Sequence, residues 1–141
     1  MTTELSPTLS EFCQHEDLLR LAYIDRRGYP RVVPVWFVLL DGTYYFGTGT
    51  RSAKWQAMQR DRRVGWVIDG GMRGHYKGAS MRGQAEEIHD GVLRARVYQA
   101  LGQKYFDTSD HPKFLEIFGQ ADDPETVYVQ LVPEDGLTWE Y

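Results

Sequence analysis

The chain has 141 residues, of which 42% are hydrophobic and 13% aromatic, a composition that excludes a disordered chain and suits one domain with a proper core. Its formal net charge of −4 argues against a general nucleic-acid binder. Cys13 is the only cysteine, no apolar run approaches the roughly 20 residues that span a bilayer, and the start MTTELSPTLSEF lacks the pattern of a signal peptide, so we expect a cytoplasmic protein.

The first third of the chain predicts a helix and three strands. Ser6-Pro7-Thr8 is a helix start, and a helix is expected over residues 7–15. Strands are expected from Leu19 to Asp25 and from Pro30 to Leu40, the latter rich in β-branched and aromatic residues. Asp41-Gly42 then predicts a tight hairpin into the strand TYYFGT. We expect these three strands to form an antiparallel meander.

The rest of the chain continues this pattern with inserted helices. A helix carrying Ala57 and Met58 precedes a strand RRVGWVID and a strand from His75 to Ile88. We predict one domain that is mainly β with inserted helices, with about six antiparallel strands that form a small barrel. Its parts are an N-terminal helix over about 7–15, the barrel over about 19–88 and 125–141, and helices over about 91–107 and 112–118.

The strand PRVVPVWFVLL has two apolar faces. Val33, Val35, Phe37 and Leu39 alternate with Val32, Trp36, Val38 and Leu40. One face can fill a barrel, but the other must be covered by a helix, a partner subunit or a flat ligand. Pro34 cannot donate to a strand ladder, so it belongs on an edge, at a bulge or where the sheet parts.

The charges are unevenly distributed along the chain. From Arg51 to Arg82 there are eight Lys or Arg and only two Asp or Glu, a local balance of +6, while the rest of the chain carries −10. This segment predicts a local anion site. A solvated charged surface explains the same count, and a nucleic-acid contact is a weaker alternative.

The segment GTGTRSAK, residues 47–54, joins a strand to a helix inside this basic segment. It lacks the third glycine of a dinucleotide fingerprint and does not fit the P-loop pattern. A helix that starts near Thr50 or Ser52 nevertheless leaves free N–H groups, to which Thr48 can add a hydroxyl and Lys54 a positive charge. The combination suits a phosphate. An ordinary helix cap with an exposed lysine is the alternative.

Other chemistry is sparse. The four histidines show no metal-ligand spacing, the single cysteine gives little basis for a thiolate site, and no carboxylate pair is recognisable. We therefore expect no metal and assign no catalytic residue. An apparent phosphate site with little acid–base equipment favours a cofactor that carries its own chemistry.

An ordered series of motifs resembles the pyridoxamine 5'-phosphate oxidase-like split-barrel flavoproteins. The series is G-x-P-x-x-x-P-x-W-F from Gly28, a hairpin, T-x-x-x-x-x-K from Thr48 to Lys54, R-D-x-R-V from Arg60, x-G-x-A in the fifth strand, and the ending LVPEDGLTWEY. The match runs from about Leu19 to Tyr141 and is looser in the helices between residues 91 and 120.

The resemblance implies a six-stranded antiparallel split β-barrel of the FMN-binding type. It also implies a homodimer that binds FMN, or in a sister group a deazaflavin coenzyme, in a cleft at the subunit interface. It places Thr48, Ser52 and Lys54 at the cofactor phosphate, with Thr50 and Arg51 nearby. It also places a strand along the isoalloxazine ring and Lys77 within reach of the cofactor. The residues expected on that strand are Arg31, Val33, Pro34, Val35 and Trp36.

Two departures from the family pattern affect the expected activity. The oxidase that acts on pyridoxine phosphate has an Arg-Lys pair at the junction, whereas this chain has Ala53 before Lys54, and its ending TWEY is acidic and apolar rather than basic. We expect an FMN-dependent oxidoreductase that moves a hydride between the cofactor and a small organic substrate. A deazaflavin-dependent reductase is the alternative, and a non-catalytic flavin- or haem-binding protein is an alternative of another class.

Overall fold

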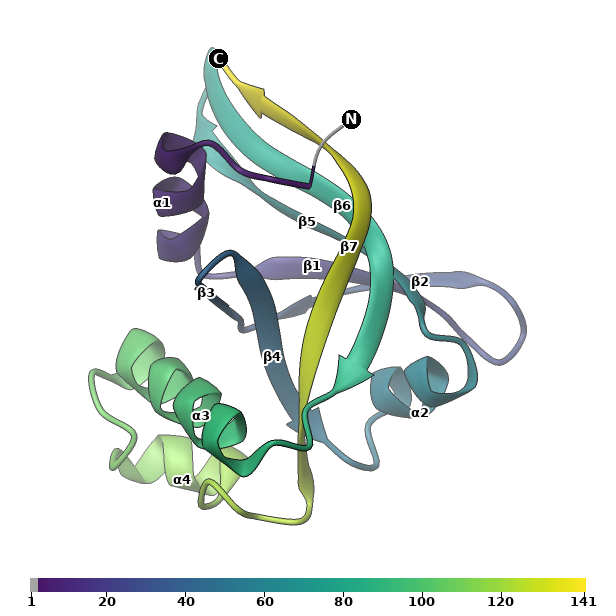
Figure 1. The fold of residues 1–141 in the computed structure, drawn as a ribbon, viewed down its shortest axis with the longest axis vertical. Helices are drawn as coiled ribbons and strands as arrows, with labels where there is room; N and C mark the ends of the chain where they lie inside the picture. Colours follow the sequence, from purple (N-terminus) through teal and green to yellow (C-terminus); the bar gives the residue numbers. More distant parts are fainter. Residues whose placement is uncertain (1–2) are drawn as a thin grey trace.

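Seven antiparallel strands and four helices make up the computed structural model, which describes residues 3–141 (Figure 1). In chain order the elements are α1 (Pro7–His15), β1 (Leu19–Ile24), β2 (Pro30–Val35), β3 (Val38–Leu40), β4 (Thr43–Gly49), α2 (Ala53–Arg60), β5 (Arg63–Met72), β6 (His75–Glu87), α3 (Gly91–Phe106), α4 (Pro112–Phe118) and β7 (Thr126–Glu140). None of the helices in this described part is long and apolar enough to cross a membrane.

All seven strands belong to one sheet in the order β2-β1-β5-β6-β7-β4-β3, and every neighbouring pair is antiparallel. The sheet is strongly curved (Figure 1) but does not close, because β2 and β3 are at its two edges and do not pair with each other. The expected mainly β split barrel is therefore confirmed.

The strand count and the first meander are corrected by the structure. The single strand expected from Pro30 to Leu40 is interrupted at Trp36 and Phe37, which raises the number of strands from six to seven. β2 pairs with β1 and β3 pairs with β4, so consecutive strands of the chain lie at opposite edges of the sheet. Pro34 lies on the edge strand β2, one of the places that its missing N–H predicts.

The hairpin between β3 and β4 has the turn that its sequence predicts. Asp41 and Gly42 both have positive φ, at 51° and 80°, and Leu40 pairs with Thr43 across them. Asp is one of the few non-glycine residues that adopt this left-handed conformation readily, and Asp-Gly suits the twist of a two-residue hairpin.

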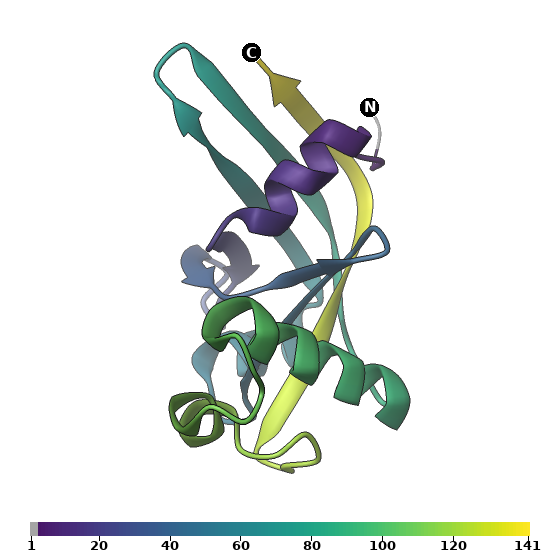
Figure 2. The same ribbon diagram turned by 90° about the vertical axis from the view of Figure 1, so that its left-hand side faces the viewer.

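The main hydrophobic core lies inside the curved sheet, and α1 covers one end of it. Leu9 and Cys13 on α1 are almost completely buried, among β-strand side chains such as Phe46 and Ile68. Figure 2 shows α1 across the sheet and α3 with α4 below it. The side of β2 and β3 that faces this core supplies Val35 and Leu39.

A second apolar cluster lies between the sheet and the helices α3 and α4. This cluster covers the second apolar face of the segment PRVVPVWFVLL around residue 36. Trp36 stacks on Tyr105 of α3, with ring centroids 4.6 Å apart, and also contacts Phe118 of α4. Val38 of β3 is buried in the same cluster. Helices, rather than solvent, thus cover the second face beyond residue 35.

Tyr105 and Lys104 of α3 form hydrogen bonds with the backbone of Phe37, in the interruption between β2 and β3. The hydroxyl of Tyr105 accepts a hydrogen bond from the Phe37 N–H at 3.0 Å and lies 2.7 Å from the Asp17 carbonyl. The Lys104 ammonium group donates to the Phe37 carbonyl at 3.1 Å and lies 3.7 Å from the centroid of the Phe37 ring. Backbone groups that would otherwise lack a ladder partner are therefore satisfied by α3.

Candidate functional site

The junction between β4 and α2 has the hydrogen bonding of a helix cap. Ser52 caps α2: its Oγ accepts from the Trp55 N–H at 3.2 Å and from the Thr48 hydroxyl at 3.0 Å. Thr48, at the end of β4, is buried. The N–H groups of Ala53 and Lys54 come before that of Gln56, which donates to the Ser52 carbonyl as the first intrahelical bond, so they remain available to an anion at the helix start.

Lys54 is in the first turn of α2, where the helix dipole disfavours a cation. The side chain is half-buried, and burial lowers the pKa of its ammonium group. Within residues 3–141 it has no hydrogen-bond or ion-pair partner. A lysine without a partner, held partly out of water at the positive end of a helix, favours binding of an anion there.

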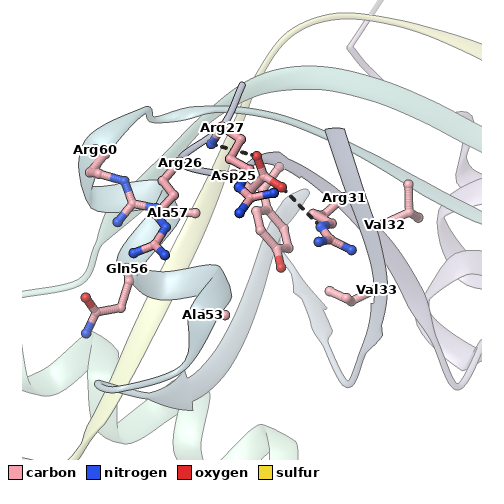
Figure 3. A pocket seen from close by; sticks show the side chains of 11 residues that line it. Asp25, Arg26, Arg27, Arg31, Val32, Val33, Ala53, Gln56, Ala57 and Arg60 are labelled. Atoms are coloured by element: carbon pink, nitrogen blue, oxygen red, sulfur yellow. Dashed lines mark hydrogen bonds and ion pairs between the residues drawn. The ribbon is translucent and has the colours of Figure 1, made fainter. Parts of the chain in front are cut away.

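A groove of about 590 Å³ runs alongside α2 (Figure 3). Its α2 wall is one face of the helix, with Ala53, Ala57 and Arg60 spaced by four and three residues. β1, β2 and the turn between them form the other wall. The complete lining is Tyr23, Asp25, Arg26, Arg27, Arg31, Val32, Val33, Ala53, Gln56, Ala57 and Arg60.

Four arginines and one carboxylate line this groove, a balance of three positive charges. Asp25 accepts hydrogen bonds from the backbone N–H groups of Arg27 and Tyr29 and from the Arg31 guanidinium at 3.2 Å. These bonds, the one from Tyr29 foremost, lower the pKa of the Asp25 carboxyl. Asp25 therefore fixes the turn and orients Arg31, and the other three guanidinium groups remain without an acidic partner in the described chain.

Most arginines outside the groove are compensated. The pairs are Arg20 with Asp69, Arg62 with Glu86, Arg63 with Asp61, Arg82 with Asp135 and Arg96 with Asp41. The unpaired arginines of the groove thus lie beside α2. Only Arg60 of them belongs to the basic segment from Arg51 to Arg82, in which Arg62, Arg63 and Arg82 are paired, so the groove combines one residue of that segment with arginines from the β1–β2 region.

The structure brings part of the predicted site together. Thr48, Thr50, Arg51, Ser52 and Lys54 follow one another through the β4–α2 junction, next to Ala53 at the groove wall. The Thr50 N–H donates to the Glu125 carbonyl at 2.9 Å, which ties the junction to the segment before β7.

Arg31 and Val33 of the predicted β2 residues line the groove itself, whereas the other predicted residues lie elsewhere. Val35 is in the barrel core, Pro34 is exposed on β2, and Trp36 packs against α3 and α4. Lys77 is on β6, where its ammonium group lies 5.8 Å from the centroid of the Phe12 ring. Within one chain, Trp36 and Lys77 are therefore not part of the groove.

Arg26, Arg27 and Arg60 are the basic residues of the groove that the sequence did not indicate as site residues. The first two lie in the β1–β2 turn and the third is at the end of α2, so their proximity depends on tertiary structure. A partial signal was present: Arg60 follows Ala53 by seven residues, which places both on one helix face.

Metal and thiol chemistry have little support in the part of the chain that the structure describes. No group of three or more His, Cys, Asp or Glu side chains there is placed to hold a metal ion. Cys13 is completely buried, and burial raises the pKa of its thiol to about 11. The groove contains no histidine or cysteine among its lining residues.

Comparison with known families gives a match over nearly the whole chain. Residues 5–140 match the family model described as pyridoxamine 5'-phosphate oxidase. No curated protein sequence is significantly similar to this chain.

Solved structures with the same fold come from several kinds of protein. The conserved hypothetical protein Rv2991 from Mycobacterium tuberculosis is 22% identical with a TM-score of 0.80, over 97% of this chain and 86% of that one. HutZ, the haem storage protein from Vibrio cholerae, is 19% identical with a TM-score of 0.73, over 97% and 94%. An F420 reductase is 18% identical with a TM-score of 0.71, over 94% and 98%. At these identities the likeness shows the fold.

Proposed function

This chain belongs to the pyridoxamine 5'-phosphate oxidase family, and we propose that it is an oxidoreductase that holds the phosphate of FMN, or of a deazaflavin coenzyme, at the β4–α2 junction. The observation that carries the proposal is the unpartnered, half-buried Lys54 beside the free amides at the start of α2. An F420 reductase among the proteins of the same fold supports the deazaflavin version.

The described residues fit a phosphate monoester or diester. The amides of Ala53 and Lys54 and the ammonium group of Lys54 offer three donors at the helix start. Arg31, held by Asp25, lines the adjoining groove and adds a second cationic side chain. Charge-assisted hydrogen bonds of this kind are stronger than neutral ones and suit an anionic phosphate.

The chain's contribution to the reaction is binding and orientation. When bound, a flavin or deazaflavin ring supplies hydride transfer with a small organic substrate. Asp25 is the one carboxylate in the groove, and its three hydrogen bonds keep it ionised and engaged. We therefore assign it the role of positioning Arg31 and not that of an acid or base.

We also propose that the functional unit is a homodimer in which each cofactor is completed by the second subunit. Val32 on β2 is 66% exposed and Met72 at the end of β5 is 74% exposed, and both are apolar. Lys77 lies outside the groove of its own chain, so a second subunit would bring it to a cofactor. Light scattering after gel filtration tests the dimer, and Val32→Arg should convert it to a monomer.

The test of the proposed function begins with the absorption spectrum of freshly purified protein, which separates flavin, deazaflavin and haem. Titration of the apoprotein with FMN and with the deazaflavin coenzyme then compares wild type with Lys54→Ala. We expect this change to weaken binding by about 1.5–3 kcal/mol, the value of a charge-assisted hydrogen bond. Lys113→Ala, on the exposed face of α4, is the matched control. Unchanged affinity of Lys54→Ala for both cofactors would contradict the proposal.

A turnover experiment distinguishes an oxidoreductase from a protein that only binds the cofactor. The loaded protein is reduced chemically and then mixed with small quinone or nitroaromatic acceptors. Reoxidation faster than that of the free reduced cofactor supports an oxidoreductase. Retention of flavin or haem without acceleration supports a binding protein instead, a role that corresponds to that of HutZ, a haem storage protein.

A further inference from the structure

A second cavity lies at the open edge of β3, between the end of α1 and the helix α3. Its volume is about 420 Å³, which is in the range of small-molecule sites. Figure 2 shows the β3–β4 hairpin between these two helices. The apolar part of the lining consists of Val38, Leu39, Leu40 and Ala100. The cavity shares no lining residue with the groove beside α2, so it is a separate place for a ligand.

The backbone of Leu39 presents a donor and an acceptor at this open edge. Leu40 and Thr43 flank a two-residue turn and therefore form the hydrogen-bonded pair that closes the hairpin. Leu39 and Tyr44 are then the next pair, which is not hydrogen-bonded, so the N–H and C=O groups of Leu39 point away from β4. Phe37 has the same orientation two residues earlier, and there α3 supplies the partners.

Two opposite charges line the cavity without pairing with each other. The Lys104 ammonium group donates to the Phe37 carbonyl, which leaves two of its three N–H groups for another acceptor. The Asp17 carboxylate has no hydrogen-bond or ion-pair partner in residues 3–141. Asp17 nevertheless raises the pKa of Lys104, against the larger effect of burial, so the two groups lie near each other. One small ligand that carries both charges can therefore satisfy both side chains.

A free α-amino acid has the groups that this edge complements. Two residues that face each other in an antiparallel sheet can exchange both backbone hydrogen bonds. An amino acid does the same when its carboxylate accepts from the Leu39 N–H and its ammonium group donates to the Leu39 C=O. The Leu39 N–H is adjacent along the edge to the Phe37 C=O, where Lys104 donates, so the carboxylate lies on the Lys104 side.

We propose that this cavity binds a free α-amino acid with an apolar side chain. Lys104 and the Leu39 N–H hold its carboxylate, Asp17 and the Leu39 C=O hold its ammonium group, and its side chain lies against the apolar lining. A simple carboxylic acid would leave Asp17 without a partner, and a simple amine would leave Lys104 without one. The inference goes beyond the proposed function, because the cofactor phosphate at Lys54 is in another part of the molecule.

The test is isothermal titration calorimetry of the purified protein with matched ligands. The ligands are L-leucine and L-phenylalanine, their amides, which lack the carboxylate, and their N-acetyl forms, which lack the ammonium group. The contact with Lys104 is tested through the ligand, because Lys104 also supports the backbone at Phe37. The variants are Asp17→Asn and Gln103→Trp, both at exposed positions of the lining. Asp110→Asn, exposed and outside the cavity, is the control.

We expect wild type and Asp110→Asn to bind at least one of the two amino acids about tenfold or more tightly than its amide and its N-acetyl form, because each derivative loses charge-assisted hydrogen bonds. Asp17→Asn should weaken the amino acid at least about fivefold and change the N-acetyl form less than about twofold. Gln103→Trp should abolish binding by filling the cavity. Equal binding of the amide, unchanged affinity in Asp17→Asn, or no binding of either amino acid at millimolar concentration would overturn the inference.

The two binding sites can fail separately. If Lys54→Ala loses cofactor affinity and binds the amino acid as wild type does, both assignments stand. If wild type binds a cofactor but neither amino acid, the proposed function stands and the inference falls. If amino-acid binding is lost in Lys54→Ala and retained in Gln103→Trp, the amino acid lies in the groove beside α2, which also overturns the inference.

Discussion

Thr48 donates a hydrogen bond to Ser52 across the β4–α2 junction, with 3.0 Å between the two hydroxyl oxygens. The Ser52 oxygen also accepts from the Trp55 N–H, so one atom both caps α2 and anchors the buried end of β4. The start of α2 is thus fixed before any ligand arrives. Because the helix start is already ordered by these hydrogen bonds, ligand binding does not have to supply the free energy of ordering it.

Ser52 provides the first prediction, because its stabilising and binding roles can be separated. Ser52→Ala removes the cap and should lower the free energy of unfolding by about 1 kcal/mol in urea titrations. Ser52→Asp keeps a good capping residue and should retain most of the stability, yet its negative charge should weaken phosphate binding. Equal cofactor affinity in Ser52→Asp and wild type would place the phosphate elsewhere.

Lys54 should show a trade-off between stability and binding. Burial lowers the pKa of its ammonium group, and no described residue compensates its charge. Lys54→Met should therefore raise the free energy of unfolding of the apoprotein by roughly 0.5–1 kcal/mol, while cofactor affinity falls. The measurement is denaturant unfolding with and without cofactor. A variant that is less stable than wild type without cofactor would show that Lys54 supports the fold.

Lys104 should make stability depend on alkaline pH. Burial lowers its pKa to about 8 from 10.5, against the opposing effect of Asp17 and Glu16. The unfolded state therefore binds more protons than the folded state between these two values, and stability from this group rises with pH across that window.

The measurement compares wild type with Lys104→Met in urea at pH 7 and at pH 10. The free energy of unfolding of wild type minus that of Lys104→Met should be larger at pH 10 than at pH 7, by roughly 1–2 kcal/mol after allowance for solvent screening. Cys13 acts in the opposite sense in both proteins, because its raised pKa makes the folded state lose stability as pH rises above the ordinary thiol value, so the difference between the two proteins reports mainly on Lys104. A constant difference across pH would contradict the assignment.

The hydroxyl of Tyr105 should contribute to stability by pairing a backbone N–H at the interruption between β2 and β3. Its hydroxyl accepts from the Phe37 N–H at 3.0 Å. Tyr105→Phe keeps the stacking on Trp36 but leaves that partly buried N–H unpaired, so we expect a loss of about 1–3 kcal/mol in the free energy of unfolding. Tyr29→Phe, at a position 68% exposed, is the control and should change stability little.

Gly83 should tolerate no side chain. It lies at the register shift between β6 and β7, where a Cβ atom would overlap the Val132 carbonyl oxygen. Because that neighbour is backbone, Gly83→Ala should cost about 2–3 kcal/mol of unfolding free energy, measured by thermal or urea unfolding. Gly91→Ala, at the open start of α3, should be neutral or stabilising by up to about 1 kcal/mol.

The parts of the structure that depend on local chemistry were predictable from the sequence. The Asp41-Gly42 turn and the capping of α2 by Ser52 follow from the conformational preferences and hydrogen bonds of a few adjacent residues. Free N–H groups also occur at helix starts, so the junction could be selected from the sequence as a candidate anion site. The family resemblance then supplied the split barrel, which local rules do not give, whereas the order of the strands in the sheet came only from the structure.

The parts that depend on tertiary structure were not predictable in this way. Both faces are apolar from Val32 to Leu40, so no period in the sequence marks the interruption at Trp36 and Phe37, and Pro34 lies inside β2 rather than at the interruption. That interruption exists because one stretch of chain pairs with two different strands and because α3 satisfies the backbone between them. The groove likewise combines Arg26 and Arg60, which are 34 positions apart in the sequence.

The interruption at Trp36 and Phe37 has a further consequence for self-association. An open sheet normally offers two separate unpaired strands to which foreign chains can add. Here the two edge strands, β2 and β3, are consecutive in the chain and separated by only two residues. The two unpaired edges of the sheet therefore start from the same short segment. A second molecule that covered both edge strands would leave no unpaired strand for aggregation. One of these edges, β2, also borders the groove through Arg31 and Val33.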